Sequence, residues 1–200
     1  MKNLYLLLLF IFIFSCNANE NSAPTQGKLQ NGVYTNDFLG WKVKITEGWE
    51  ITPNEQRKRW DSIGKEMVEN NAPNEPLYLL SFHMKNDDFI GLMSSLNPLE
   101  LYPNLDNERK LLEISERKTR EGMQKEFGVE PSFTYGEYEI DNMRFITQDI
   151  VYKLPPDYEP FYQKVFVNFI NNYIFTMAAS WRKEKDKKQL FEIINSSEFK

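Results

Sequence analysis

The chain has 200 residues, a formal net charge of −5, 14% aromatic residues and a single cysteine. This length is enough for one domain with a sizeable core. The acidic balance argues against nucleic-acid binding, because phosphate contacts need a basic face. With one cysteine the chain cannot form an internal disulfide, and a metal site built from several cysteines is excluded.

The N-terminal residues are typical of an export signal. Lys2 precedes a run of eleven apolar residues, Leu4 to Phe14, which one serine separates from Cys16. A membrane-spanning helix needs about 20 apolar residues, so this run is too short to span a bilayer. The four residues 13–16 resemble a bacterial lipobox, in which the cysteine is lipidated and becomes the mature N-terminus. We therefore expect a signal peptide over 1–15 and a lipid anchor on Cys16; plain secretion and a retained anchor are the alternatives.

The segment 16–32 is predicted to be a flexible tether. It contains one large apolar residue, Leu29, among polar and small residues. A segment of this composition cannot bury enough apolar surface to offset the entropy that is lost when it orders. The folded domain is accordingly expected over 33–200, held off a membrane by the tether.

Alternation of apolar and polar residues predicts the strands of the first half. In the segment 40–46 every second residue is apolar, and the turn Glu47-Gly48 leads into a returning strand over 49–51, so we expect a hairpin. The strand 77–84 carries apolar residues on both faces, which favours a sheet that is covered on both sides. A further strand is expected over 89–96.

Capping residues and helical spacing predict three helices. A capping box begins the first helix, which covers about 52–69. The second helix is capped by Asp106 or Asn107 and runs to about Phe127. The third helix covers about 183–195, and its apolar residues are expected to dock on the sheet.

Two β-hairpins in series occupy the second half and predict a four-strand antiparallel meander. Each has a two-residue turn, Asp141-Asn142 or Asn171-Asn172, of residue types that tolerate the positive φ of tight turns. The four strands are expected over 132–140, 143–153, 161–170 and 173–181. The complete pattern predicts an α+β domain, with an antiparallel sheet of about six to seven strands between helices in an α/β/α sandwich.

Three parts of the chain resemble the PsbP-like superfamily, in particular the DcrB-like group of small bacterial lipoproteins with the Mog/PsbP-type fold. They are the strand and turn over 41–51, the meander 135–181 and the terminal helix with its ending 190–199. The resemblance covers about 33–199 and implies an antiparallel sheet sandwiched by helices, with roles in binding and assembly. It transfers no partner-contacting residue and no catalytic site to this chain, and a fold alone does not specify a function.

The sequence predicts no catalytic residues, cofactor or metal site. His83 is the only histidine, and a lone histidine near a strand end is usually structural or at the surface. Asp87-Asp88 is expected in a turn, because adjacent carboxylates on an extended chain point to opposite faces. Asn104, Asp106 and Glu108 alternate like the start of a calcium loop, but the required turn glycine is missing. We therefore do not expect an enzyme.

Two surface segments are candidates for contact with a protein partner. The first is a proline-rich tip in which Tyr158, Phe161 and Tyr162 lie near three prolines, because rigid exposed aromatic residues bind with little loss of entropy. The alternative is that Phe161 and Tyr162 simply begin the next strand, with alternate residues buried. The second candidate is the loop 97–104, with Leu101 and Tyr102.

These observations predict a non-enzymatic domain in the cell envelope, anchored to the inner or outer membrane and facing the periplasm or the cell surface. It would bind a protein partner of unknown identity or help envelope assembly, in an oligomeric state that the sequence leaves open. The alternative is an exported protein that binds a small ligand or a glycan through surface tryptophans and tyrosines. Burial of the four tryptophans would remove the main support for that alternative; they are Trp41, Trp49, Trp60 and Trp181.

Overall fold

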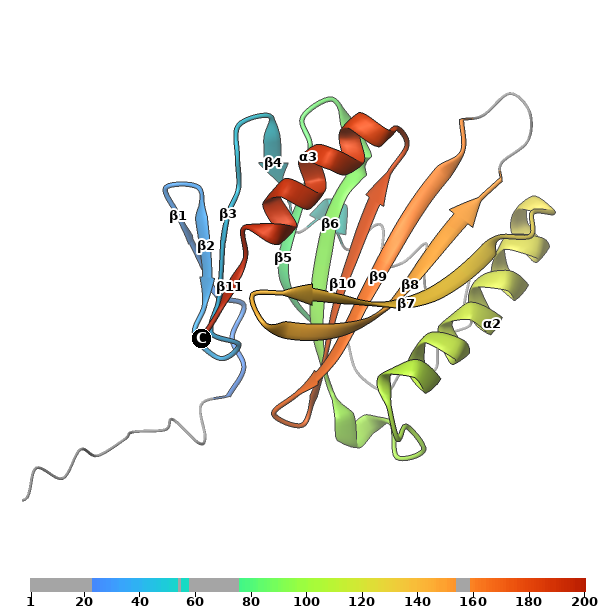
Figure 1. Cartoon of the computed structure of the whole chain (residues 1–200), viewed down its shortest axis with the longest axis horizontal. Helices are drawn as coiled ribbons and strands as arrows, with labels where there is room; N and C mark the ends of the chain where they lie inside the picture. The colour runs from blue at the N-terminus through green and yellow to red at the C-terminus, as the bar shows by residue number, and fades with distance from the viewer. Residues whose placement is uncertain (1–22, 54, 58–75, 154–158) are drawn as a thin grey trace, which may run out of the picture.

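The computed structural model describes residues 23–53, 55–57, 76–153 and 159–200. In these ranges the chain forms two antiparallel β-sheets, the α-helices α2 and α3, a helical stretch over 55–57 and a short 3-10 helix (Figure 1). The α+β class predicted from the sequence is therefore confirmed.

The larger sheet has seven strands in the order β4-β5-β6-β10-β9-β8-β7. The strands β7 to β10 are the predicted meander, and β10 joins it to the first half of the chain by pairing with β6. The strands are β4 (Trp49–Ile51), β5 (Leu77–Met84), β6 (Asp87–Pro98), β7 (Ser132–Ile140), β8 (Met143–Tyr152), β9 (Phe161–Ile170) and β10 (Tyr173–Trp181).

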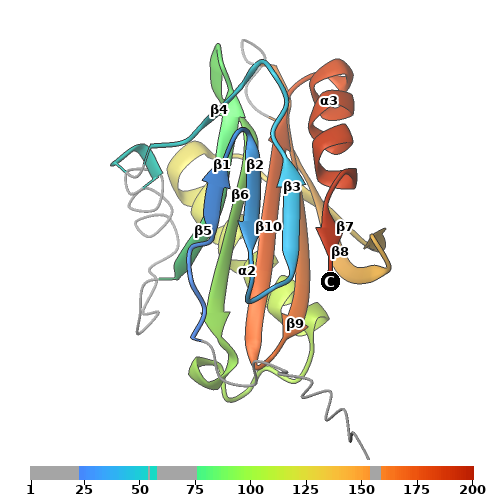
Figure 2. The ribbon, with the colours of Figure 1, turned by 90° about the vertical axis from the view of Figure 1, so that its left-hand side faces the viewer.

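The smaller sheet has four strands in the order β1-β2-β3-β11. Together with helix α3 it lies over one face of the larger sheet, which we call the inner face, whereas α2 lies over the opposite, outer face (Figures 1 and 2). These elements are β1 (Lys28–Gln30), β2 (Val33–Asn36), β3 (Trp41–Lys44), β11 (Glu198–Phe199), α2 (Glu108–Phe127) and α3 (Glu184–Asn195).

The main core lies between the inner face, the smaller sheet and α3. The indole of Trp41 on β3 is 1% exposed, stacks on Phe199 at 6.0 Å and meets Phe175 of β10 edge-on at 5.5 Å between ring centroids. Its Nε1 donates a hydrogen bond of 3.1 Å to Ser197 Oγ. The helix α3 adds three buried residues to this core, Leu190, Ile193 and Ile194.

A smaller core on the outer face joins α2 to the meander. Leu112 of α2 packs with Val167 of β9 and Ile174 of β10, and all three are buried. The helix is capped as predicted, because Asn107 Oδ1 accepts a hydrogen bond of 2.9 Å from the backbone N–H of Lys110. No helix in the described ranges combines the length and the apolar character needed to cross a bilayer.

The hairpin turns of the meander are confirmed residue by residue. Asp141, Asn142, Asn171 and Asn172 all have φ between 48° and 64°, as a type I′ turn requires. Of the first predicted helix, over about 52–69, only 55–57 are described, and they are helical. The rest of that prediction lies outside the described residues.

The predicted hairpin between 40–46 and 49–51 is wrong. The strand β3 pairs with β2 and β11 in the smaller sheet, whereas β4 pairs with β5 in the larger one. The two tryptophans pack in different places, because Trp41 is buried between the sheets and Trp49 meets Phe82 edge-on at 5.4 Å. The turn at Glu47-Gly48 therefore carries the chain from one sheet to the other.

The domain begins before the predicted boundary at residue 33. The strand β1 lies inside the predicted tether and pairs with β2, from Lys28↔Thr35 to Gln30↔Val33. Its side chains are exposed, so the strand is held by backbone pairing with β2. For the same reason an alternation of apolar and polar residues could not predict this strand. The hydroxyl of Tyr34 also donates to the carbonyl of Gln26 at 2.7 Å, which fixes the chain ahead of β1.

Two smaller differences concern the segments around β6. Asp87-Asp88 begins this strand, and Lys85-Asn86 forms the turn that was predicted at the aspartates. The predicted loop 97–104 contains the end of β6 and a 3-10 helix, η1 (Leu99–Leu101).

Replacing Trp41 by alanine should lower the free energy of unfolding by about 3–5 kcal/mol, because it leaves a cavity between the two sheets. Ser197→Ala should cost about 1–3 kcal/mol, because it leaves the buried indole N–H without its acceptor. Urea unfolding at neutral pH measures both losses. Lys42→Ala, on the exposed face of the same strand, is the control and should stay within about 0.5 kcal/mol of the unsubstituted chain. A similar small loss for all three would contradict the central position of Trp41.

Candidate functional site

The outer face carries an apolar hollow where β6 begins and β10 ends. The hollow has a volume of about 220 Å³ and lies over β6, β10 and β9, with Phe82 of the neighbouring strand β5 and Leu92 of β6 also in its lining. We call it the outer-face hollow. Its walls on the outer face are formed by Asp88, Phe89, Gly91, Met93, Phe161, Gln163, Ala178 and Ser180.

Small residues on adjacent strands create this hollow. Ser180 of β10 lies directly opposite Gly91 of β6 on one side and Gln163 of β9 on the other. Gly91 is required by close packing, because a Cβ there would lie 2.2 Å from the carbonyl oxygen of Phe82. Because small residues meet here, the surface of the sheet is recessed, and the larger side chains of Phe89 and Phe161 form the sides of the hollow.

Two polar side chains in this largely apolar hollow, Gln163 and Ser180, are hydrogen-bonded. The hydroxyl of Tyr152 donates to Gln163 Oε1 at 3.3 Å, and Gln163 Nε2 donates to Ser180 Oγ at 3.3 Å. Burial raises the pKa of Tyr152 to about 12, because the phenolate would lose its hydration. The chain of donors and acceptors fixes these two side chains in the hollow.

The rim combines an exposed aromatic ring with a carboxylate. Phe89 is 60% exposed, which is unusual for so large an apolar side chain, and the Arg182 guanidinium lies 5.6 Å from its ring centroid. Arg182 also pairs with Asp87 at 3.6 Å. Asp88 lies on the same rim with its side chain 59% exposed, and its Oδ1 is 3.5 Å from His83 Nε2.

His83 links two strands and does not form a reactive site. Its Nδ1 lies 3.1 Å from Thr52 Oγ1, so a hydroxyl, an imidazole and the carboxylate of Asp88 are in series. A nucleophile must reach a substrate, but Thr52 is only 2% exposed. The contact instead ties the residue after β4 to β5. In the described part of the chain, no three His, Cys, Asp or Glu side chains are grouped so that they could hold a metal ion.

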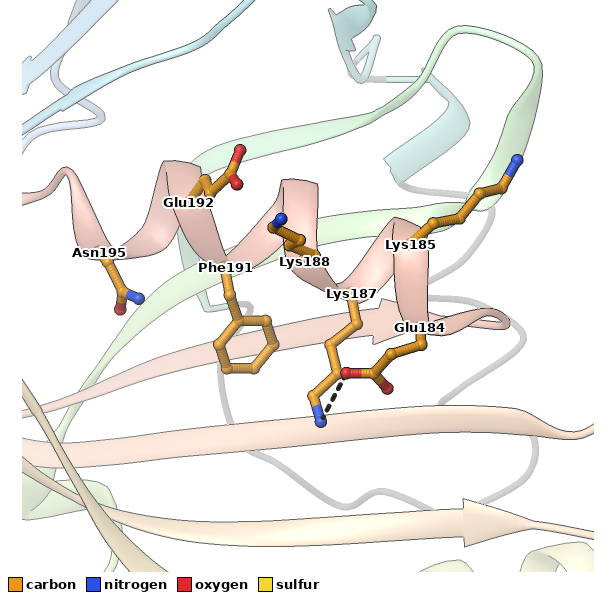
Figure 3. A pocket seen from close by; sticks show the side chains of 7 residues that line it. All are labelled: Glu184, Lys185, Lys187, Lys188, Phe191, Glu192 and Asn195. Carbon is orange, nitrogen blue, oxygen red and sulfur yellow. Dashed lines mark ion pairs between the residues drawn. The ribbon is translucent and has the colours of Figure 1, made fainter.

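A second depression lies along α3 (Figure 3). Its volume is about 480 Å³, and charged side chains surround the ring of Phe191. Lys187 and Glu184 form an ion pair of 3.7 Å here, and Phe191 is occupied by contacts with Trp181 and Tyr138. Charges of both signs alternate along this surface, which is typical of a solvated helix face.

The structure separates the predicted partner-binding residues of the proline-rich tip. Phe161 and Tyr162 begin β9 and point to opposite faces. Phe161 lines the outer-face hollow, and its ring lies 5.6 Å from that of Tyr152. Tyr162 stacks on Trp181 at 6.1 Å on the inner face. Tyr158 lies outside the described residues.

The residues of the second predicted segment lie near α2. Leu101 ends η1 and is half-buried, and Tyr102 packs against the core that is formed by Leu112. Burial raises the pKa of Tyr102. This segment therefore contributes to packing on the outer face, at the opposite end of β6 from the outer-face hollow.

The tryptophans offer little surface for ligand stacking. Trp41 and Trp181 are buried, and Trp49 is half-buried against Phe82. Trp60 lies outside the described residues. Sequence reasoning missed Phe89 and Ala178, the residues that shape the hollow, because they are far apart in the chain and become neighbours only through the pairing of β6 with β10.

One solved structure of similar fold is cyanobacterial PsbP from Synechocystis sp. PCC 6803, determined in solution. It matches with a TM-score of 0.53 and 10% sequence identity, over 90% of this chain and 98% of that chain. The chain therefore has a PsbP-like fold, and at this identity the likeness concerns the fold alone. No family model matches the chain, and no curated protein sequence matches it.

The raised pKa of Tyr152 predicts how stability changes in alkali. The folded value is about 12, above the ordinary value of 10.0, so the protonated phenol stabilises the fold fully below about pH 10 and this stabilisation is lost as the pH rises towards about 12. Tyr152→Phe should therefore show a shallower fall in unfolding free energy over this range. Burial raises the pKa of Tyr34 to about 12 as well, so Tyr34→Phe is a positive control. Urea unfolding at a series of alkaline pH values is the measurement, and an unchanged slope for Tyr152→Phe would contradict the burial of this hydroxyl.

Proposed function

We propose that the chain is a membrane-anchored bacterial lipoprotein of the DcrB-like kind, whose PsbP-like domain binds a protein partner in the cell envelope without catalysing a reaction. The observation that carries this proposal is the position of Cys16, directly after a short apolar run and one serine. The strand β1 begins at Lys28, so eleven residues, 17–27, separate the cysteine from the sheet. Even fully extended they reach about 40 Å, which keeps the domain close to the bilayer.

The size of the outer-face hollow supports a protein partner over a small ligand. Pockets for small molecules usually measure about 300–1,000 Å³, and this hollow measures about 220 Å³. It can take one apolar side chain of a larger molecule, in the way that a buried anchor residue fills a pocket at a protein interface. Trp41 and Trp181 are buried and Trp49 is half-buried, so these three tryptophans offer little surface to a glycan.

The chemistry of the rim specifies the kind of segment that fits. Phe89 and Phe161 provide aromatic walls, and the exposed carboxylate of Asp88 lies beside them. Arg182 is already paired with Asp87, so the remaining charge on this rim is negative, in keeping with the net charge of −5. The partner that we propose presents an aromatic side chain next to a lysine or arginine.

Cys16→Ser should abolish the incorporation of an alkyne-labelled fatty acid, because the thiol that carries the lipid is gone. Labelling in cells measures this effect. Ser15→Ala is the matched control, since alanine is also small, and it should remain labelled. Continued labelling of Cys16→Ser, or an unlabelled native chain, would refute the anchor.

A photo-reactive benzoylphenylalanine at position 89 should capture one partner protein in cells, whereas the same residue at position 127 should not. Phe127 is the fair comparison, because it is 52% exposed and ends α2. Asp88→Lys should lower capture at position 89 by about three- to tenfold, because a like charge would face the basic residue of the partner.

The captured peptide, sequenced by mass spectrometry, should contain an aromatic residue beside a lysine or arginine. Equal capture from both positions, or no effect of Asp88→Lys, would contradict the proposed site. Crosslinks to a glycan or a small molecule would instead favour the alternative function.

A further inference from the structure

The strand β7 lies at one edge of the larger sheet. In the described part of the chain, no strand pairs with the backbone groups on its free side. The strand β7 is nine residues long, and among the described strands it pairs with β8 alone. Exposed edges are usually protected by charged side chains, especially lysine, by proline or by a bulge. The residues 132–140 contain neither lysine nor proline and carry charge only at Glu137 and Glu139, and their register with β8 runs without a shift.

The turn at Asp141-Asn142 determines which backbone groups face the free edge. In a two-residue turn the flanking pair, Ile140 and Met143, is hydrogen-bonded. Hydrogen-bonded pairs alternate with non-hydrogen-bonded pairs along an antiparallel ladder. The N–H and C=O groups of every second residue therefore point away from β8; these residues are Phe133, Tyr135, Glu137 and Glu139.

Gly136 stands at the midpoint of β7 and has no role within its own chain that requires glycine. Its φ is not positive, and a Cβ built there would meet only Thr147 Oγ1, at an ordinary contact distance of 3.5 Å. Glycine in the middle of a strand weakens that strand, and it often marks a place where another backbone approaches closely. Gly136 is exposed, so such an approach can come from outside the chain.

A second copy of the chain would place an acidic side chain beside each arginine-covered ring of this edge. If two β7 strands pair antiparallel about Gly136, Glu137 faces the partner's Tyr135 and Glu139 faces the partner's Phe133 on the outer face. An arginine of α2 covers each of these rings: the guanidinium of Arg109 lies 3.4 Å from the centroid of Tyr135, and that of Arg120 lies 4.7 Å from that of Phe133. Within one chain Arg109 pairs with Glu113, Arg120 with Glu116 and Glu130, and Glu137 with Arg144. Across the interface each glutamate would therefore join an existing ion-pair network of the partner, twice by symmetry.

We propose that β7 is a homodimerisation edge, through which two copies of this chain join their larger sheets by antiparallel pairing centred on Gly136. The pairing satisfies the outward backbone groups of alternate residues, and the central glycines form a close, non-hydrogen-bonded pair. The proposal rests on β7 and α2, and it goes beyond the proposed lipid anchor and outer-face hollow without depending on either.

Single cysteines in the full chain, in a Cys16→Ser background, test this register. Two copies of residue 136 would have Cα atoms about 4.5 Å apart, within the range for a disulfide, so Gly136→Cys should give a disulfide-linked dimer under mild oxidation. Thr134→Cys is the matched control on the same strand, also exposed. Its two copies would be about 14 Å apart, so its dimer yield should be at least about ten times lower.

Glu137→Lys combined with Glu139→Lys should abolish the dimer in light scattering of the full chain, because lysines would then face Arg109 and Arg120. A mass of 23.8 kDa for the unsubstituted chain at high concentration, or equal disulfide yields from positions 134 and 136, would overturn the proposal. Disulfide adducts of Gly136→Cys with a different protein in cells would likewise overturn it and assign the edge to another partner.

Discussion

The burial of Trp41 between the two sheets is the interaction on which the rest of the structure depends. Its indole stacks on Phe199, meets Phe175 edge-on and donates to Ser197. One side chain thus joins a strand near the N-terminus, the central strand β10 and the last residues of the chain. The backbone at Gly40 and the backbone at the C-terminal Lys200 also approach closely, because a Cβ at Gly40 would lie 1.9 Å from the carbonyl oxygen of Lys200. The smaller sheet and the larger sheet are consequently one packed unit.

This arrangement gives the two faces of the larger sheet different neighbours. The smaller sheet and α3 take the inner face, where the large apolar side chains of β6, β9 and β10 are buried. The outer face has α2 over the meander, and the outer-face hollow lies at one end of the sheet. Because the chain enters the smaller sheet at β1, the proposed anchor joins the domain on the inner side, where the smaller sheet lies (Figure 2). The outer-face hollow is on the opposite face of the larger sheet.

Local signals in the sequence predict the meander and the helices, because residue types determine turns and caps directly. Asp141-Asn142 and Asn171-Asn172 are adapted to positive φ, and Asn107 has the side chain that caps a helix. The smaller sheet is not predictable in this way, since β1 is exposed and β11 has only two residues. The outer-face hollow depends on Gly91, Ala178 and Ser180, whose small size has meaning only once β6 and β10 are paired. Phe161 was predicted as a site residue from its rigid surroundings, and it does line the hollow, while Tyr162 beside it serves the core.

The central claim is that this packed unit works at a membrane, tethered through the residue that ends the apolar N-terminal run. Mass spectrometry of the N-terminal peptide, from protein isolated out of the cells that make it, tests that claim most directly. The expected peptide begins at Cys16 and carries a diacylglycerol on its sulfur. A mature chain that begins at any other residue, or an unmodified Cys16 thiol, would contradict it.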